Sequence, residues 1–187
     1  GYALCILDSG AGHADLTGEY AAITDELKAV SRHFGKEVLR EVPEADFLRE
    51  LPALRKEAGD RGVLRAFHFY AENQRAADEA QALRDGDFDR FLELVRASGR
   101  SSAQYLQNVV PTGQTEHQEL MVTIALSERI LAGRGAVRVH GGGFGGTAQA
   151  FVPLDLLEEF RTRTEEVLGA GSCHVLSIRP VGGTRIA

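Results

Sequence analysis

The sequence has 187 residues, of which 43% are hydrophobic and 26% are charged, and this is the composition of a globular protein with about one domain. It carries 21 Lys and Arg against 27 Asp and Glu, a net charge of −6 with the basic residues scattered, so we expect no nucleic-acid partner, which would need a clustered basic face. No apolar run approaches the ~18 residues that span a bilayer, so we expect no membrane partner either.

The chain opens in a predicted strand. Residues 2–8, "YALCILD", form a continuous apolar run that ends at Asp-Ser-Gly, which is typical of a buried strand. A loop over 10–13 follows. We then expect a helix that Thr17 caps and that stops at Gly35. Because the chain begins directly in a strand and without methionine, we expect it to be cut from a longer protein.

Helical spacing of apolar residues dominates the middle of the chain. Prolines 43 and 52 divide the first part into short helices, and Asp87 is expected to be an N-cap. The Ser- and Gly-rich stretch 99–114 is the best candidate for a loop. The predicted elements of this block are short helices in 37–60, a long helix over 61–84, a turn and helix over 85–98, and a helix over 117–133.

The hydrophobic period then changes to that of strands. Residues 136–140, "AVRVH", and 147–153, "TAQAFVP", alternate as strands do. An amphipathic helix over 154–169 and a last strand over 172–180 complete the chain. If the helical block is one expanded crossover, the order is β-α-β-β-α-β. This predicts an α+β fold of the ferredoxin-like, split β-α-β class with a long multi-helix insertion, and an antiparallel four-stranded sheet with helices on one face.

The two cysteines predict buried thiols. Cys5 and Cys173 both fall in apolar, strand-like runs. No Cys-x-x-Cys spacing is present, so we expect no metal site. Two buried thiols indicate a reducing compartment, and we therefore expect a cytoplasmic protein.

The stretch "HGGGFGGT" at 140–147 is the most unusual feature of the sequence. It connects two strand-like runs, so it is a hairpin loop. That context excludes a Walker A loop, which opens a helix and carries a Lys, and a dinucleotide-binding fingerprint. Two interpretations stay open. The loop is a tight, bulged hairpin with Phe144 as a hydrophobic plug, or it is a bare backbone that lets N–H groups approach phosphate oxygens or another glycine-rich loop.

Four stretches together resemble the galactokinases of the GHMP sugar-kinase superfamily. "GGGFGG" followed by "TAQAFVP" resembles the third motif of the superfamily, and "DSGAGHADLTGEY" at 8–20 resembles the galactokinase stretch that ends in a Glu-Tyr pair. Residues 65–99 resemble the galactokinase helix pair, and "SIRPVGG" at 177–183 its last strand and tail. The resemblance keeps the family order over nearly the whole chain.

The resemblance implies that residues 1–187 are a GHMP kinase C-terminal domain. In that family an N-terminal domain carries the sugar signature, the glycine-serine loop around the ATP phosphates and the catalytic Arg and Asp. None of these stretches is found here, so no catalytic residue is expected in this chain. The implied partners are galactose, ATP with Mg²⁺, and the missing N-terminal domain. The parent protein would phosphorylate galactose at C1, and we expect this chain alone to be inactive.

Individual roles also follow from the resemblance. Tyr20 matches the family tyrosine that contacts galactose. The loop of Gly141, Gly142, Gly143, Phe144, Gly145 and Gly146 matches the motif that lies beside the phosphates. His13 matches a family histidine for which a structural hydrogen bond is the favoured role, and His140 replaces a more common Thr. The paired arginines that usually follow Glu-Tyr are absent from "EYAAITDELK".

Two other functions stay open at this point. The first is a stand-alone ferredoxin-like module that binds a ligand or regulates a partner through the glycine loop. Such a module would lack the exposed apolar surface that a severed domain presents. The second is another small-molecule kinase of the GHMP class, for mevalonate or homoserine. Tyr20 within "GEY" and the "RPVGG" tail argue against that second alternative.

Overall fold

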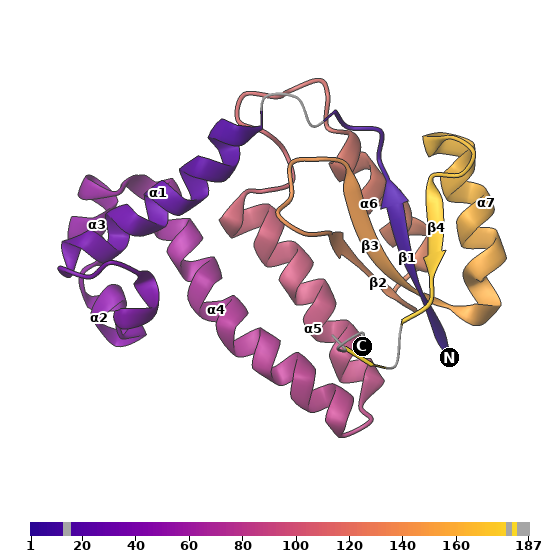
Figure 1. The fold of residues 1–187 in the computed structure, drawn as a ribbon, viewed down its shortest axis with the longest axis horizontal. Coiled ribbons are helices and arrows are strands. Elements are labelled where there is room, and N and C mark those ends of the chain that lie inside the picture. Colours follow the sequence, from indigo (N-terminus) through magenta and orange to yellow (C-terminus); the bar gives the residue numbers. More distant parts are fainter. Residues whose placement is uncertain (13–15, 179–180, 183–187) are drawn as a thin grey trace, which may run out of the picture.

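The computed structural model describes residues 1–12, 16–178 and 181–182, and it shows a small sheet with helices around it and a helical arm (Figure 1). The strands are β1 (Tyr2–Asp8), β2 (Ala136–Val139), β3 (Thr147–Pro153) and β4 (Cys173–Leu176). They lie in the order β2-β3-β1-β4, and every neighbouring pair is antiparallel. This confirms the predicted β-α-β-β-α-β fold. The last strand is shorter than predicted and ends at Leu176.

The helices occur where the apolar spacing predicted them, with small shifts of their ends. Gly35, in the left-handed region at φ +66°, follows the end of the first helix as expected. Pro52 lies in the first turn of α3, where its missing N–H does no harm. The helices are α1 (Thr17–His33), α2 (Glu44–Arg49), α3 (Leu51–Glu57), α4 (Gly59–Arg84), α5 (Phe88–Ser101), α6 (Glu119–Leu131) and α7 (Leu157–Leu168).

One predicted helix cap forms and the other does not. The Asp87 side chain accepts a hydrogen bond from Arg90 N at 3.0 Å, so this N-cap is confirmed. Thr17 is the first residue of α1, and the residue before it, Leu16, already has helical backbone angles. The Leu16 carbonyl receives the N–H groups of Glu19 and Tyr20. No side chain among the described residues caps this helix, and the prediction for Thr17 is wrong.

The predicted loop over 99–114 begins later than expected. Helix α5 continues to Ser101, a π-helical turn covers Ser102–Leu106, and the chain leaves it at Gln107, where φ is +56°. Small residues explain the difference, because they allow close packing of α5 against β2. A Cβ on Gly99 would lie 3.0 Å from the Cβ of Arg138 and 3.2 Å from the Val137 carbonyl oxygen. The composition that is typical of a loop serves here as a helix contact.

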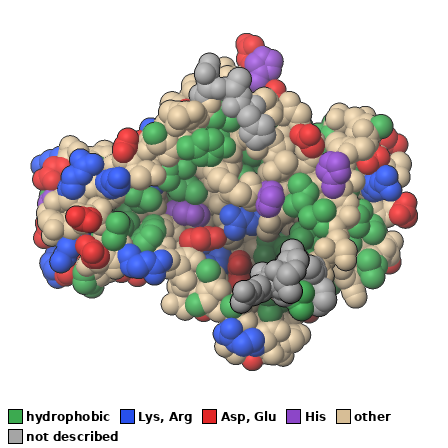
Figure 2. All heavy atoms as spheres, in the orientation of Figure 1, with side chains coloured by type: hydrophobic (Ala, Val, Ile, Leu, Met, Phe, Trp, Pro, Cys, Tyr) green, Lys and Arg blue, Asp and Glu red, His purple; other side chains and the backbone are tan. Residues whose placement is uncertain are grey.

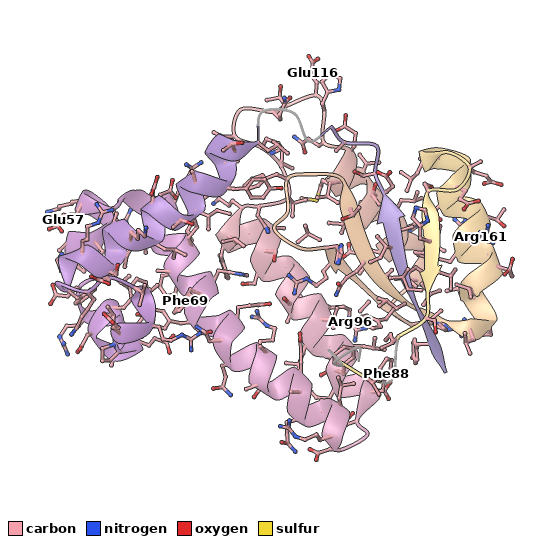
Figure 3. All side chains as sticks on the ribbon, viewed as in Figure 1. Glu57, Phe69, Phe88, Arg96, Glu116 and Arg161 are labelled. Carbon is pink, nitrogen blue, oxygen red and sulfur yellow. The ribbon has the colours of Figure 1, made fainter. Side chains whose placement is uncertain are left out.

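Helices cover both faces of the sheet, so the prediction of helices on one face is wrong. Alternate residues of the strands, such as Cys5, Val137 and Ala150, face the main core with α6 and α7. Ala136 and Phe151 point to the opposite face, where they pack with α5. The Phe88 ring of α5 (labelled in Figure 3) also contacts the Tyr2 ring at the start of β1, with 4.7 Å between their centroids.

The helical arm has a core of its own. Helices α1, α2, α3 and α4 enclose the buried ring of Phe47, which packs against Val30, Leu54 and Ala66. Figure 2 shows charged side chains gathered on the outside of this arm. Among the described residues, no helix is long and apolar enough to cross a membrane. Cys5 and Cys173 are both free and buried, as predicted.

A buried polar network joins α4 to α5 and β2. Glu72 accepts hydrogen bonds from the Ser98 hydroxyl and the Arg75 guanidinium, and its carboxylate lies 3.3 Å from Arg138 Nη1. His68, one turn earlier on α4, is buried with its Nδ1 2.9 Å from Ser101 Oγ. Burial lowers the pKa of His68, and the nearby Arg75 and Arg138 lower it further, while Glu72 opposes them. The neutral imidazole is therefore the form that the fold favours.

This environment predicts a pH dependence of stability. The unfolded chain takes up a proton at His68 near its ordinary pKa of 6.5, while the folded chain resists it. The stabilisation from His68 is therefore fully present above about pH 6.5 and is lost as the pH falls from there through the lower folded pKa. We expect the free energy of unfolding to fall more steeply between about pH 7 and pH 5 in the wild type than in His68→Gln. Urea unfolding at several pH values measures both. Parallel curves for the two proteins would contradict the prediction.

Candidate functional site

Tyr20 and the glycine loop meet in the structure although 123 residues separate Tyr20 from Gly143. The Tyr20 hydroxyl donates a hydrogen bond to the Gly143 carbonyl oxygen at 2.7 Å. The Tyr20 ring also meets the Phe144 ring edge to face, with 5.5 Å between centroids and 81° between planes. Tyr20 itself remains 40% exposed. Since its proton is directed at Gly143, the hydroxyl oxygen offers only its lone pairs to a ligand.

The glycine loop depends on backbone angles that side chains disfavour. Gly141, Gly143 and Gly146 have φ of +68°, +85° and +79°. Gly143 has a second constraint, because a Cβ there would lie 2.0 Å from the carbonyl oxygen of Asn108. Phe144 also has a positive φ of +54°, which is uncommon for a bulky residue. The loop is therefore held in its path by contacts with other segments.

The two halves of the loop have different surroundings. Gly143 to Gly146 are buried, and the Phe144 ring is only 2% exposed, in keeping with a hydrophobic plug. The Phe144 N–H donates to the Asn108 carbonyl, and the Ser9 N–H donates to the Gly146 carbonyl, each at 2.6 Å. Gly141 and Gly142 are exposed, and their N–H groups have no hydrogen-bond partner within the described part of the chain. This half offers the bare backbone of the other interpretation.

Of the two histidines named from the sequence, the structure describes only His140. His140 is exposed at the start of the loop, where its N–H donates to the Thr147 carbonyl at 2.9 Å and closes the hairpin. Its ring Nδ1 lies 3.3 Å from Thr147 Oγ1. His13 lies outside the residues that the structure describes.

A cavity of about 400 Å³ lies beside the loop. The turn after β1, the start of α1 and the segment 109–120 form its walls, and Phe144 closes it from the side of the glycine loop. Its polar lining includes Glu19, Thr112 and His117. Glu116 projects from the outer end of the same segment (Figure 3). Among the described residues, no group of three or more His, Cys, Asp or Glu side chains could hold a metal ion.

Sequence reasoning missed the residues that bind these parts together. The Thr112 N–H and hydroxyl donate to the Glu19 carboxylate at 2.8 and 3.0 Å. Arg61 of α4 donates to Thr112 Oγ1 at 2.9 Å and also pairs with Glu26 of α1. Asn108 contacts the glycine loop directly. Asn108 and Thr112 lie within the predicted loop over 99–114, and the prediction of a loop carries no information on which side chains point inward.

Comparisons with known proteins bear on the fold and on the class of protein. No family model matches the chain. The structure of L. major mevalonate kinase in complex with R-mevalonate superposes with a TM-score of 0.52 at 13% identity, over 93% of this chain and 41% of that one. Lactococcus lactis galactokinase, solved in complex with galactose, superposes with a TM-score of 0.70 at 27% identity, over 93% of this chain and 44% of that one. The fold is that of the GHMP kinases.

The sequence comparisons narrow the class. A galactokinase of Mannheimia succiniciproducens is 33% identical over 162 residues, which are 85% of this chain and 39% of the relative. A galactokinase of Actinobacillus pleuropneumoniae serotype 3 is 29% identical over 161 residues, 86% of this chain and 40% of the relative. The chain thus spans about 40% of the length of the curated relatives it matches. It is a galactokinase-like C-terminal region.

Proposed function

We propose that this region is the C-terminal half of an enzyme that transfers the γ-phosphoryl group of ATP to the C1 hydroxyl of galactose. The observation that carries the proposal is the hydrogen bond between Tyr20 and Gly143, because it joins the side chain that we propose for the sugar to the loop that we propose for the phosphates. The presence of galactose in the L. lactis galactokinase structure supports galactose as the substrate. The cytoplasm is the proposed location, in keeping with two free, buried thiols.

The residues present suit phosphoryl transfer, in which a protein mainly positions reactants and stabilises charge. The Tyr20 oxygen would accept a hydrogen bond from a sugar hydroxyl, and its ring would cover an apolar sugar face. The exposed N–H groups of Gly141 and Gly142 fit phosphate oxygens. Mg²⁺ bound with ATP would neutralise phosphate charge. The base or positioning carboxylate, and the second phosphate loop, would come from the N-terminal domain.

Exposed apolar side chains at the last strand also support the proposal that this region packs against another domain. Val175 and Leu176 of β4 and the following Ile178 are all exposed. A stand-alone module has no reason to leave three large apolar side chains of one short segment in water. This observation favours the enzyme half over the ligand-binding or regulatory module.

The direct test compares two proteins in one assay. The 187-residue chain and the full-length protein are incubated with ATP, Mg²⁺ and either galactose, galactosamine, mevalonate or homoserine. We expect galactose 1-phosphate from the full-length protein and no product above background from the chain alone. Product from the chain alone would overturn the proposed division of labour. Phosphorylation of mevalonate or homoserine would favour the alternative of another GHMP-class kinase. A separate observation, a start codon directly upstream of Gly1 in the gene, would favour the stand-alone binding or regulatory module.

Removal of one oxygen tests the role of Tyr20. In the full-length protein, we expect Tyr20→Phe to raise the KM for galactose by roughly tenfold, which corresponds to the loss of one hydrogen bond, with a smaller change in kcat. Tyr105→Phe is the matched control. Tyr105 is similarly exposed, and its hydroxyl has no hydrogen-bond partner among the described residues. Steady-state kinetics measure both variants. An unchanged KM for Tyr20→Phe would contradict the assignment of Tyr20 to the sugar.

A further inference from the structure

The segment 106–112, here called the strap, is fixed at both ends. Near its start, Arg65 of α4 donates from Nε to the Leu106 carbonyl at 3.0 Å. At its end, Thr112 is bound to Glu19 and to Arg61. Between these points Gln107 takes a left-handed backbone conformation, with φ of +56°. The strap is therefore held by α1 and α4 independently of the glycine loop.

Asn108 is the residue of the strap that contacts the glycine loop. Its backbone carbonyl accepts the Phe144 N–H at 2.6 Å, and its side-chain Nδ2 donates to the Gly142 carbonyl at 3.1 Å. Asn108 is only 2% exposed. A Cβ on Gly143 would lie 2.6 Å from Asn108 Nδ2 and 2.7 Å from Asn108 Cγ, so only a glycine can pack this closely against the Asn108 amide.

The Asn108 side chain is not explained by packing alone. Its Oδ1 is buried and has no hydrogen-bond partner within the described residues. A buried acceptor without a partner is unfavourable, and an apolar residue of the same shape would avoid this loss. The advantage of an amide at this position therefore lies in its Nδ2 group, which binds the Gly142 carbonyl.

This bond sets the direction of one peptide group. The C=O of Gly142 and the N–H of Gly143 belong to the same planar trans peptide and point in opposite directions. When Nδ2 holds the Gly142 oxygen toward the strap, the Gly143 N–H must point away from it. The neighbouring Gly141 and Gly142 N–H groups belong to the same exposed turn. A single side chain thus orients the Gly142–Gly143 peptide, which joins the exposed and the buried halves of the loop.

We propose that Asn108 is a positioning residue that holds the Gly142–Gly143 peptide in the orientation that the loop needs to bind the phosphate while it is transferred. This rests on the proposed function for its chemistry, and on the contacts above for its geometry. Asn108 does not touch the reactants. It acts through the Gly142 carbonyl, and its loss changes the loop while the backbone bond to Phe144 remains.

The experiment uses the full-length protein with Asn108→Ala, the same-shaped Asn108→Asp, which cannot donate when ionised, and the control Gln104→Ala. Gln104 is an exposed amide of the adjacent π-helical turn. Amide hydrogen exchange over 141–146 is measured together with kcat and the KM for galactose. For both Asn108 variants we expect exchange of the Gly145 N–H, which is bonded to the Gly143 carbonyl, to be at least roughly tenfold faster. We expect kcat to be lower by roughly tenfold or more, with the KM for galactose within about twofold.

The outcomes separate this inference from the proposed function. Unchanged exchange in the loop of the Asn108 variants overturns the inference whatever the activity. Faster exchange with unchanged kcat overturns the positioning role in the reaction. If the wild-type protein does not phosphorylate galactose but the variants show faster exchange, the hold of Asn108 on the loop stands and the proposed function fails. The asparagine variants and Gln104→Ala should share the same exchange in α4 and α5, and a general increase there in the variants would overturn a local role.

Discussion

Gly143→Ala is expected to lower kcat/KM of the full-length protein by about a hundredfold or more and to destabilise it. The added Cβ would meet the Asn108 carbonyl oxygen at 2.0 Å, a distance at which one of two backbones must move. The φ of +85° adds strain of about 1–2 kcal/mol for any residue with a side chain. Movement of either segment breaks the bonds from Asn108 to the loop and separates Gly143 from Tyr20. Thermal unfolding and steady-state kinetics measure the two effects.

Gly141→Ala is the control that separates strain from collision. Gly141 shares the loop and a positive φ of +68°, but a Cβ there meets nothing within 4 Å. We therefore expect only the conformational penalty of the positive φ, about 1–2 kcal/mol in stability. Equal effects of the two substitutions would show that the close approach of Gly143 to Asn108 is not what constrains the loop.

Glu26→Ala is expected to cost about 3–5 kcal/mol of folding free energy, because it leaves a buried cation without its partner. Arg65 is 0% exposed, and its Nη1 lies 2.8 Å from the Glu26 carboxylate, which is itself 21% exposed. Glu26 also receives Arg61 at 2.5 Å. Burial lowers the pKa of Arg65, and the Glu26 carboxylate opposes this by favouring the charged guanidinium. Chemical denaturation of wild type and variant measures the loss.

An exposed ion pair in the same helical arm should contribute much less to stability. Arg55 and Asp60 are joined by a hydrogen bond of 2.6 Å, but both side chains are well exposed. Water replaces such a partner readily, so we expect Arg55→Ala to leave the denaturation midpoint almost unchanged. A loss for Arg55→Ala comparable to that for Glu26→Ala would contradict the argument from burial.

Much of this fold could be predicted because its elements are local patterns. The strand over 2–8, the helix that Gly35 ends and the Asp87 cap each depend on a few neighbouring residues. The predicted site was reached in a different way, through the resemblance of "GEY" and "GGGFGG" to a known family. The structure then placed Tyr20 against Gly143.

What could not be predicted depends on contacts between distant segments. Gly99 and the serines near it have the composition of a loop, and only the surface of β2 makes them a helix contact. Asn108 carries no local signal, because its role is defined by the Gly142 carbonyl, 34 positions away. The alternation of strand residues does not tell whether both faces of the sheet are covered. Only the packing of Ala136 with α5 shows that a helix covers the second face.

The strand order has a consequence for folding during synthesis on the ribosome. The first strand of this region, β1, pairs with β3 and β4, whose residues are among the last of the region to be made. Until then the apolar side chains of Ala3, Cys5 and Leu7 have no sheet to cover them. The helical arm, whose contacts are closer in sequence, can form earlier. We therefore expect slow, late closure of the sheet and a need for chaperone protection of this region during synthesis, greatest around β1.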